Sequence, residues 1–106
     1  MKEPTDAQVK EFWGKCGFAF HDGSGWMYGW YQEDKLVGQD IKLDLNNLFK
    51  YAVPFLIEEL ANSMAQKGAV DLDFCRLWMM KRWLRAWNDD PGDPALALFW
   101  VIREAM

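Results

Sequence analysis

The stretch Arg76–Asn88, RLWMMKRWLRAWN, decides the fold class of this 106-residue chain, because it supports two different secondary structures. From Cys75 onward the apolar residues recur at helical spacing and cover one broad face, while basic residues gather opposite. Just before it, residues 70–74 alternate between apolar and acidic types, as at the start of a strand. We predict a helix for residues 71–88, with a strand as the alternative.

The same stretch also has an unusual charge. It carries four cations, three tryptophans and no acid, whereas the rest of the chain holds all sixteen acids and eight of the twelve basic residues. Guanidinium groups beside flat aromatic rings suit planar anions such as nucleotides, through stacking and charge-assisted hydrogen bonds. Two residues depart from the helical pattern, since Trp78 falls among the cations and Arg76 among the apolar residues. The candidate ligand-binding residues of this stretch are Trp78, Arg76, Arg82 and Arg85, and the alternative interpretation is a solvated helix face.

The C-terminal segment predicts the most buried helix of the chain. Asp93 is an N-cap followed by Pro94 at the first helical position. The run Ala95–Ile102 is apolar on all sides, which is typical of a helix that is covered all round. We also expect Trp83 and Trp87, on the apolar side of the preceding helix, to belong to the core.

A second helical pattern begins after Asp44, which serves as its N-cap, and ends at Gly68. Pro54 lies inside this pattern, where it cannot donate a backbone hydrogen bond. It also pushes Val53 towards an extended conformation. We therefore expect one kinked helix or two helices in tandem.

The N-terminal part predicts a helix followed by a β-hairpin. Thr5 and Gln8 have the spacing of a capping box, which starts a helix over residues 6–14. Aromatic residues then alternate at strand period on both sides of the glycine-rich turn Asp22–Gly25. A third short strand is expected at residues 36–38.

Three aromatic side chains share one face of the second hairpin strand: Trp26, Tyr28 and Trp30. A packing layer beneath the helices explains them without any ligand, and contact with a ligand is the alternative that makes them candidate binding residues. Gly29, between two of them, indicates a bulge or the close approach of another group.

Together these patterns predict an α+β fold: a mainly helical single domain over residues 1–106, with an N-terminal aromatic β-hairpin and a buried C-terminal helix. A chain of this length buries roughly two-thirds of its unfolded surface, enough for a core without staples. The net charge of −4 disfavours general DNA or RNA binding. Cys16 and Cys75 lie far apart, so we expect two reduced thiols, with a disulfide as the alternative. No apolar run is long enough to cross a bilayer and the N-terminus lacks a secretion signal, so we expect a cytoplasmic protein without membrane contact.

No catalytic or metal-binding signature stands out in the sequence. His21, the single histidine, lies beside Asp22, but no nucleophile occupies a recognisable motif. The acidic clusters at residues 71–73 and 89–93 have the composition of helix caps and solvated turns. We therefore expect a protein that is not an enzyme and that needs no cofactor or metal.

Two segments carry a resemblance to a known family: Asp44–Pro54, DLNNLFKYAVP, and Asp93–Trp100, DPALALFW. Together with Glu11–Trp13 and Cys16–Phe18 they resemble small proteins of phages and prophages, and the pattern is similar to the phage ABA-sandwich domain. The resemblance covers about half of the chain. It implies a phage accessory protein of the host-cell cytoplasm. It also implies a sheet at residues 75–88, where the periodicity favours a helix. It assigns no catalytic or binding residues.

These observations lead to three functional hypotheses. The first is a non-catalytic counter-defence protein that sequesters a nucleotide-like immune signal between the cations and aromatic rings. The second is an inhibitor that binds a host defence protein. The third is a homo-oligomeric structural component, because the chain has more aromatic residues than a small core hides, and aromatic residues are enriched at interfaces. In each case we expect self-association as a dimer or higher oligomer.

Overall fold

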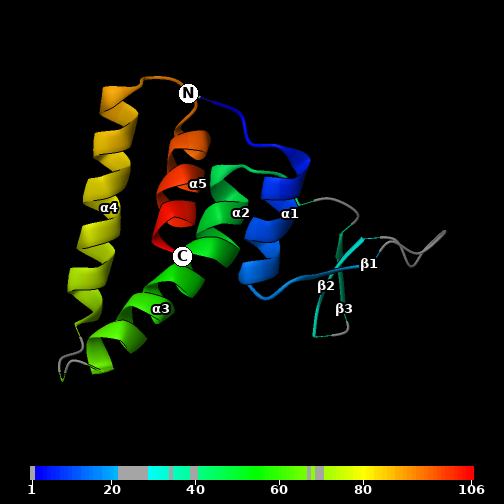
Figure 1. Ribbon diagram of the computed structural model, residues 1–106, viewed down its shortest axis with the longest axis horizontal. Coiled ribbons are helices and arrows are strands. Elements are labelled where there is room, and N and C mark those ends of the chain that lie inside the picture. Colours follow the sequence, from blue (N-terminus) through cyan, green and yellow to red (C-terminus); the bar gives the residue numbers. More distant parts are fainter. Residues whose placement is uncertain (1, 22–28, 34, 39–40, 67, 69–70) are drawn as a thin grey trace. The chain divides into compact units, whose positions relative to one another are not determined.

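The computed structural model has an α+β fold that is mainly helical, as the sequence predicts (Figure 1). The chain divides into two compact units, Lys2–Lys42 and Leu43–Met106, and each is described by itself. The residues that the structure describes are 2–21, 29–33, 35–38, 41–66, 68 and 71–106.

The N-terminal unit begins with helix α1 (Asp6–Lys15), which confirms the predicted helix. Its start is fixed by the expected capping box. The Gln8 backbone N–H donates to the Thr5 hydroxyl over 3.2 Å, and the Thr5 backbone N–H donates to the Gln8 side-chain oxygen over 2.9 Å. The helix buries the side chains of Phe12 and Trp13.

A three-stranded antiparallel sheet follows in the order β1 (Ala19–His21), β2 (Gly29–Gln32) and β3 (Lys35–Gly38). The described strands confirm the predicted antiparallel pair and the third strand, while the predicted turn Asp22–Gly25 lies outside the described residues. The pairing of β2 with β3 shifts register between Trp30 and Tyr31. This irregularity lies one residue beyond Gly29, where the sequence indicated a bulge.

The second unit begins with a short helix α2 (Leu45–Asn47), which continues through a π-helical turn η2 (Leu48–Ala52) into α3 (Val53–Gln66). The Asp44 carboxylate caps α2 by accepting the Asn47 backbone N–H over 2.8 Å. The extended conformation predicted for Val53 is wrong, since its φ of −61° and ψ of −47° are helical. The widened turn explains this result: the Val53 N–H donates to the Leu48 carbonyl, five residues back, and the chain passes Pro54 without a break.

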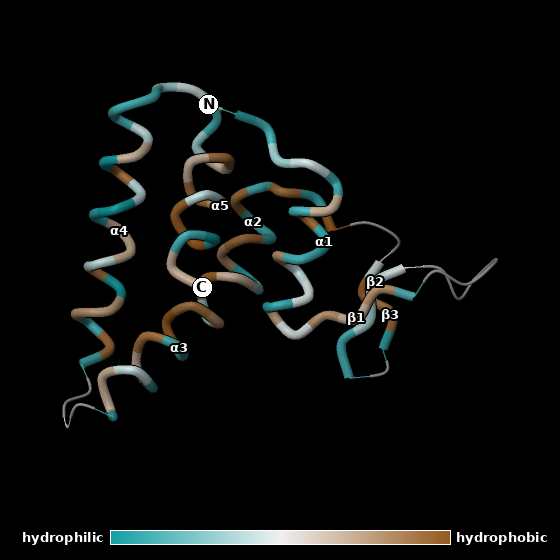
Figure 2. Tube along the Cα trace, in the orientation of Figure 1, coloured by the Kyte–Doolittle hydropathy of each residue, from teal (hydrophilic) through white to brown (hydrophobic). Residues whose placement is uncertain are grey.

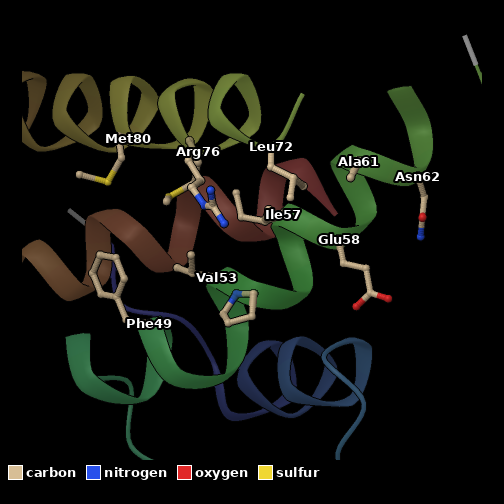
Figure 3. Close-up of a pocket in the computed structure, with 11 residues that line it drawn as sticks. Phe49, Val53, Ile57, Glu58, Ala61, Asn62, Leu72, Arg76 and Met80 are labelled. Atoms are coloured by element: carbon tan, nitrogen blue, oxygen red, sulfur yellow. The ribbon is translucent and has the colours of Figure 1, made fainter. Parts of the chain in front are cut away.

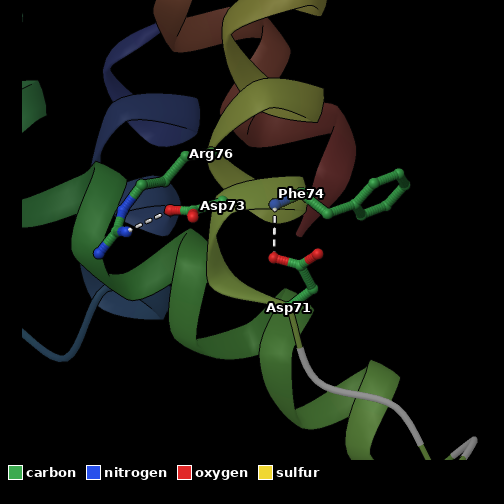
Figure 4. Close-up of polar contacts among 4 residues, drawn as sticks. All are labelled: Asp71, Asp73, Phe74 and Arg76. Carbon is green, nitrogen blue, oxygen red and sulfur yellow. Dashed lines mark hydrogen bonds and ion pairs between the residues drawn. The ribbon is translucent and has the colours of Figure 1, made fainter.

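Residues 72–89, which include the stretch Arg76–Asn88, form one continuous helix, α4 (Leu72–Asp89). The predicted helix is therefore confirmed and the alternative of a strand is wrong. The start of α4 is capped by Asp71, whose carboxylate accepts the Phe74 backbone N–H over 3.1 Å (Figure 4).

Gly68, which follows the end of α3, has the positive φ of 85° that is expected at such a position.

Helix α5 (Pro94–Ala105) forms the core of the second unit, as predicted. Its N-cap Asp93 accepts the Ala95 backbone N–H over 2.9 Å. Figure 2 shows its strongly hydrophobic course beside the mixed colouring of α4. The buried residues of α5 are Ala95, Ala97, Leu98, Phe99, Val101 and Ile102.

The apolar face of α4 is wider than the surface that the helix buries. Cys75, Met79 and Trp83 are buried in the second unit, where α4 packs against α5 and α3. Trp87 is 38% exposed, so its predicted place in the core is wrong, and Leu84 on the same broad face is 53% exposed. The neighbouring helices cover only part of a face this broad, and its edge is left in solvent.

Candidate functional site

An open groove with a volume of about 610 Å³ lies between the η2–α3 segment and α4 (Figure 3). Such a volume is in the range of ligand-binding clefts, and most of the lining side chains are apolar. One wall is formed by Phe49, Val53, Pro54, Ile57, Glu58, Ala61 and Asn62, and the other by Leu72, Arg76, Met79 and Met80.

The helical repeat explains why these side chains meet. On α3 the lining residues recur three and four positions apart, from Val53 through Ile57 to Ala61, which places them on one side of the helix. On α4 the same spacing joins Arg76 and Met80. The small side chain of Ala61 leaves space between the two walls.

Arg76 is the cationic side chain of this groove. Figure 3 shows it extending from α4 towards Ile57 on the opposite wall. Its Nη1 lies 3.3 Å from an Asp73 oxygen one turn earlier (Figure 4). The two side chains are 60% and 95% exposed, so the ion pair contributes little to folding. The guanidinium is therefore available to a bound molecule at small cost.

Aromatic contacts continue this surface along α4. Phe49, at the edge of the groove, packs edge-on against Trp83 with ring centroids 5.5 Å apart. Trp83 is held in place by its indole N–H, which donates to the Pro94 carbonyl over 3.0 Å. The Trp87 ring stacks on the Trp83 ring, with ring centroids 6.2 Å apart. A second depression follows there, lined by Leu84, Trp87, Asn88 and Pro91.

The cations predicted to act together lie on different sides of α4. At about 100° per residue, Arg85 is roughly 180° around the helix from Arg76. Arg82 and Arg85 instead line a smaller depression of about 280 Å³, and its lining also includes the oppositely charged side chains of Asp89 and Glu104. Trp78 is half-buried, and the Arg82 guanidinium lies 4.6 Å from the centre of its ring.

Of the three aromatic residues predicted on the hairpin face, Trp30 is the one that the structure describes. Trp26 and Tyr28 lie outside the described residues. Trp30 is 4% exposed and packs against Phe20 of the neighbouring strand, with ring centroids 5.0 Å apart. Its surroundings fit the packing alternative given for it from the sequence.

Sequence reasoning missed the α3 wall of the groove. Ile57, Glu58 and Asn62 were not candidates, because a helix of ordinary amphipathic composition does not reveal which of its apolar residues remain uncovered. Among the candidate residues predicted from the sequence and described by the structure, Arg76 is the one that lines the groove.

The two cysteines are free and buried, as expected, and neither lines the groove. Burial raises the pKa of the Cys16 thiol to about 12, which removes its nucleophilic form at neutral pH. The Cys75 thiol donates to the Met64 sulfur over 3.4 Å. Among the described residues, no three His, Cys, Asp or Glu side chains lie together in a way that suits a metal ion.

In the described part of the chain no helix combines the length and the apolar character needed to span a membrane. No protein-family model, no curated protein and no solved structure matches this chain.

Proposed function

We propose that this is a non-catalytic binding protein whose α3–α4 groove accepts an amphipathic α-helix of a partner protein. The observation that carries the proposal is an apolar surface that extends beyond the groove along α4. Its exposed members include Leu72 at 44%, Leu77 at 54% and Leu84 at 53%. Isolated apolar side chains on a surface are ordinary, but several along one helix beside an apolar groove mark an interaction site.

The extent of this surface favours a macromolecular partner over a small molecule. A ligand that fills about 610 Å³ between α3 and α4 contacts residues up to Met80 and leaves Leu84 and Trp87 in water. A helix laid along α4 reaches both the groove and the second depression at Trp87 and Pro91. Burial of each large anchor side chain contributes about 1.5–3 kcal/mol, and recognition of this kind uses anchors at helical spacing.

The biological setting of this proposal comes from the sequence. The resemblance to phage proteins suggests a host protein as the partner, which corresponds to the inhibitor hypothesis. A protein of this kind needs an exposed recognition surface and no reaction chemistry.

Nucleotide sequestration has less geometric support. A stacking site needs an accessible ring face beside uncompensated cations. Arg82 lies over one face of the Trp78 ring, and Asp89 and Glu104 share the depression that contains Arg82 and Arg85.

The proposal is tested with a fluorescently labelled 18-residue peptide that forms an amphipathic helix with leucines at i, i+3, i+4, i+7 and i+11. Ala61→Trp fills the groove and should weaken binding at least about tenfold, equivalent to about 1.4 kcal/mol. Ser63→Trp is the matched control, because Ser63 is exposed on the same helix and does not line the groove. Anisotropy titrations in which the peptide does not bind, or binds equally to both variants, would contradict the proposal.

A further inference from the structure

We infer that the partner helix carries an acidic residue on the flank that faces α4 and a basic residue on the flank that faces α3. This inference rests on the proposed function and names the chemistry of the partner. It follows from the different charges of the two groove walls, Arg76 on α4 and Glu58 on α3.

The Arg76 side chain has apolar neighbours along its own helix and across the groove. Leu72, Met79 and Met80 line the same wall, and Ile57 lies opposite (Figure 3). A helix seated here removes water from the guanidinium. The guanidinium keeps its bond to the Asp73 carboxylate over 3.3 Å, but its other N–H donors lose water without gaining a partner. An acidic residue on the incoming helix accepts from these donors and so favours the complex.

Glu58 imposes the complementary requirement on the other wall. Its exposed side chain lies at the outer edge of the groove and points away from α4 (Figure 3). A charge at the rim of an interface mainly affects which partner binds and how fast the two proteins associate. Glu58 therefore favours a basic residue on the partner helix over an acidic one. The two walls together select a helix whose apolar stripe is flanked by opposite charges.

A second copy of this chain does not offer this pattern through α4, the helix whose exposed apolar residues are Leu72, Phe74, Leu77, Leu84 and Trp87. The central part of α4 is flanked by Arg76 and Lys81, and its acids stand only near its two ends. Pairing of α4 with its own copy in parallel brings these cations together, and in antiparallel alignment Lys81 lies beside the partner copy's Lys81. Like charges at such positions oppose association, which favours a different protein as the occupant.

The test compares two versions of the leucine peptide that share one apolar stripe. The first has glutamates on one flank and lysines on the other, and the second has lysines on both flanks. Wild-type protein should bind the mixed peptide about tenfold more tightly. Arg76→Glu should reverse this order, because the wall then selects a base. Arg85→Glu makes the same change in net charge on the opposite side of α4 and should leave the order unchanged.

Each outcome of these titrations decides whether the groove selects an acidic residue opposite Arg76. An order that is the same in wild type and Arg76→Glu overturns the inference while leaving the groove itself as a binding site. An equal shift with Arg85→Glu also overturns it, because net charge then explains the preference. Failure of both peptides to bind removes the proposed function as well. Light scattering that shows a dimer dissociated by Leu84→Glu would identify a second copy as the occupant and overturn the inference.

Discussion

Helices α4 and α5 are both rich in apolar residues, yet they differ in how much of that surface is covered. Six residues of α5 are buried, among them Leu98, Phe99 and Ile102, which are fully inaccessible. Helix α4 buries Cys75 and Met79 but leaves large apolar side chains in solvent along its length. The apolar residues of α5 therefore stabilise the second unit, whereas those at the outer edge of α4 remain exposed to solvent.

Charge placement accounts for this difference. The apolar run of α5 is interrupted by no charge until Arg103, so each side of the helix gains by burial. In α4 charged residues recur along the whole helix, and complete burial would remove water from these charges. The helix is therefore confined to the surface, together with the apolar residues between its charges.

The largest expected effect is on the free energy of unfolding, after a substitution in the buried helix α5. Phe99→Ala should lower the free energy of unfolding by about 3–5 kcal/mol through lost transfer free energy and a cavity. Leu77→Ala on the exposed side of α4 should change it by less than about 0.5 kcal/mol. Urea denaturation measures both values, and similar losses in the two variants would show that α4 is covered as fully as α5.

A chemical probe extends the comparison of buried and exposed groups to the N-terminal unit. Because burial raises the pKa of Cys16 to about 12 from 9.0, the folded protein keeps the proton that the unfolded chain loses above pH 9. Stability should therefore fall as the pH rises from about 9 to 12, with the loss beginning near the unfolded pKa. At pH 9 iodoacetamide should modify Cys16 on the order of a thousandfold more slowly than in urea, because each pKa unit changes the thiolate fraction tenfold. Rapid modification of the folded protein would contradict the burial of this thiol.

The stacked pair Trp83 and Trp87 gives a sharper comparison within α4 itself. Trp83→Phe removes the hydrogen bond to the Pro94 carbonyl and part of a buried ring, and should cost about 1–2 kcal/mol. Trp87→Phe changes a side chain that is 38% exposed and should cost less than about 0.5 kcal/mol. Thermal unfolding of the two variants distinguishes them, and the reverse order would place Trp87 in the core after all.

The smallest effect is expected on the cationic side of α4. The double variant Arg82→Glu/Arg85→Glu should retain its melting temperature and its affinity for the leucine peptide within about twofold, because neither residue lines the groove. Loss of peptide binding in the folded double variant would move the binding surface to that side. A thermal-shift response to nucleotides that the same variant abolishes would instead support the nucleotide hypothesis.

The sequence was sufficient to predict the elements of this fold and the residues that begin them. The capping residues Thr5, Asp44 and Asp93 act locally, so their roles follow from spacing alone. The passage of the chain through Pro54 did not follow, because a π-helical turn depends on packing around the whole segment and not on the dipeptide.

The candidate site was less accessible to sequence reasoning. Helical periodicity gives the direction of an apolar face, but the width that neighbours cover depends on tertiary packing. The periodicity therefore predicts a core position for Trp87, and it does not distinguish Ile57 as part of a groove wall. Arg76 could be singled out because a cation within an apolar face is a local anomaly that sequence alone displays.

The most direct test of the groove as a binding surface is the amide chemical-shift map of the protein during titration with the mixed-charge peptide. We expect the largest shifts over residues 49–62 of the η2–α3 segment and 72–80 of α4, continuing to Leu84 and Trp87 at the second depression, with small shifts in the N-terminal unit. Large shifts confined to the cationic side of α4 or to the N-terminal unit, or no shifts at saturating peptide, would contradict the assignment of the α3–α4 groove.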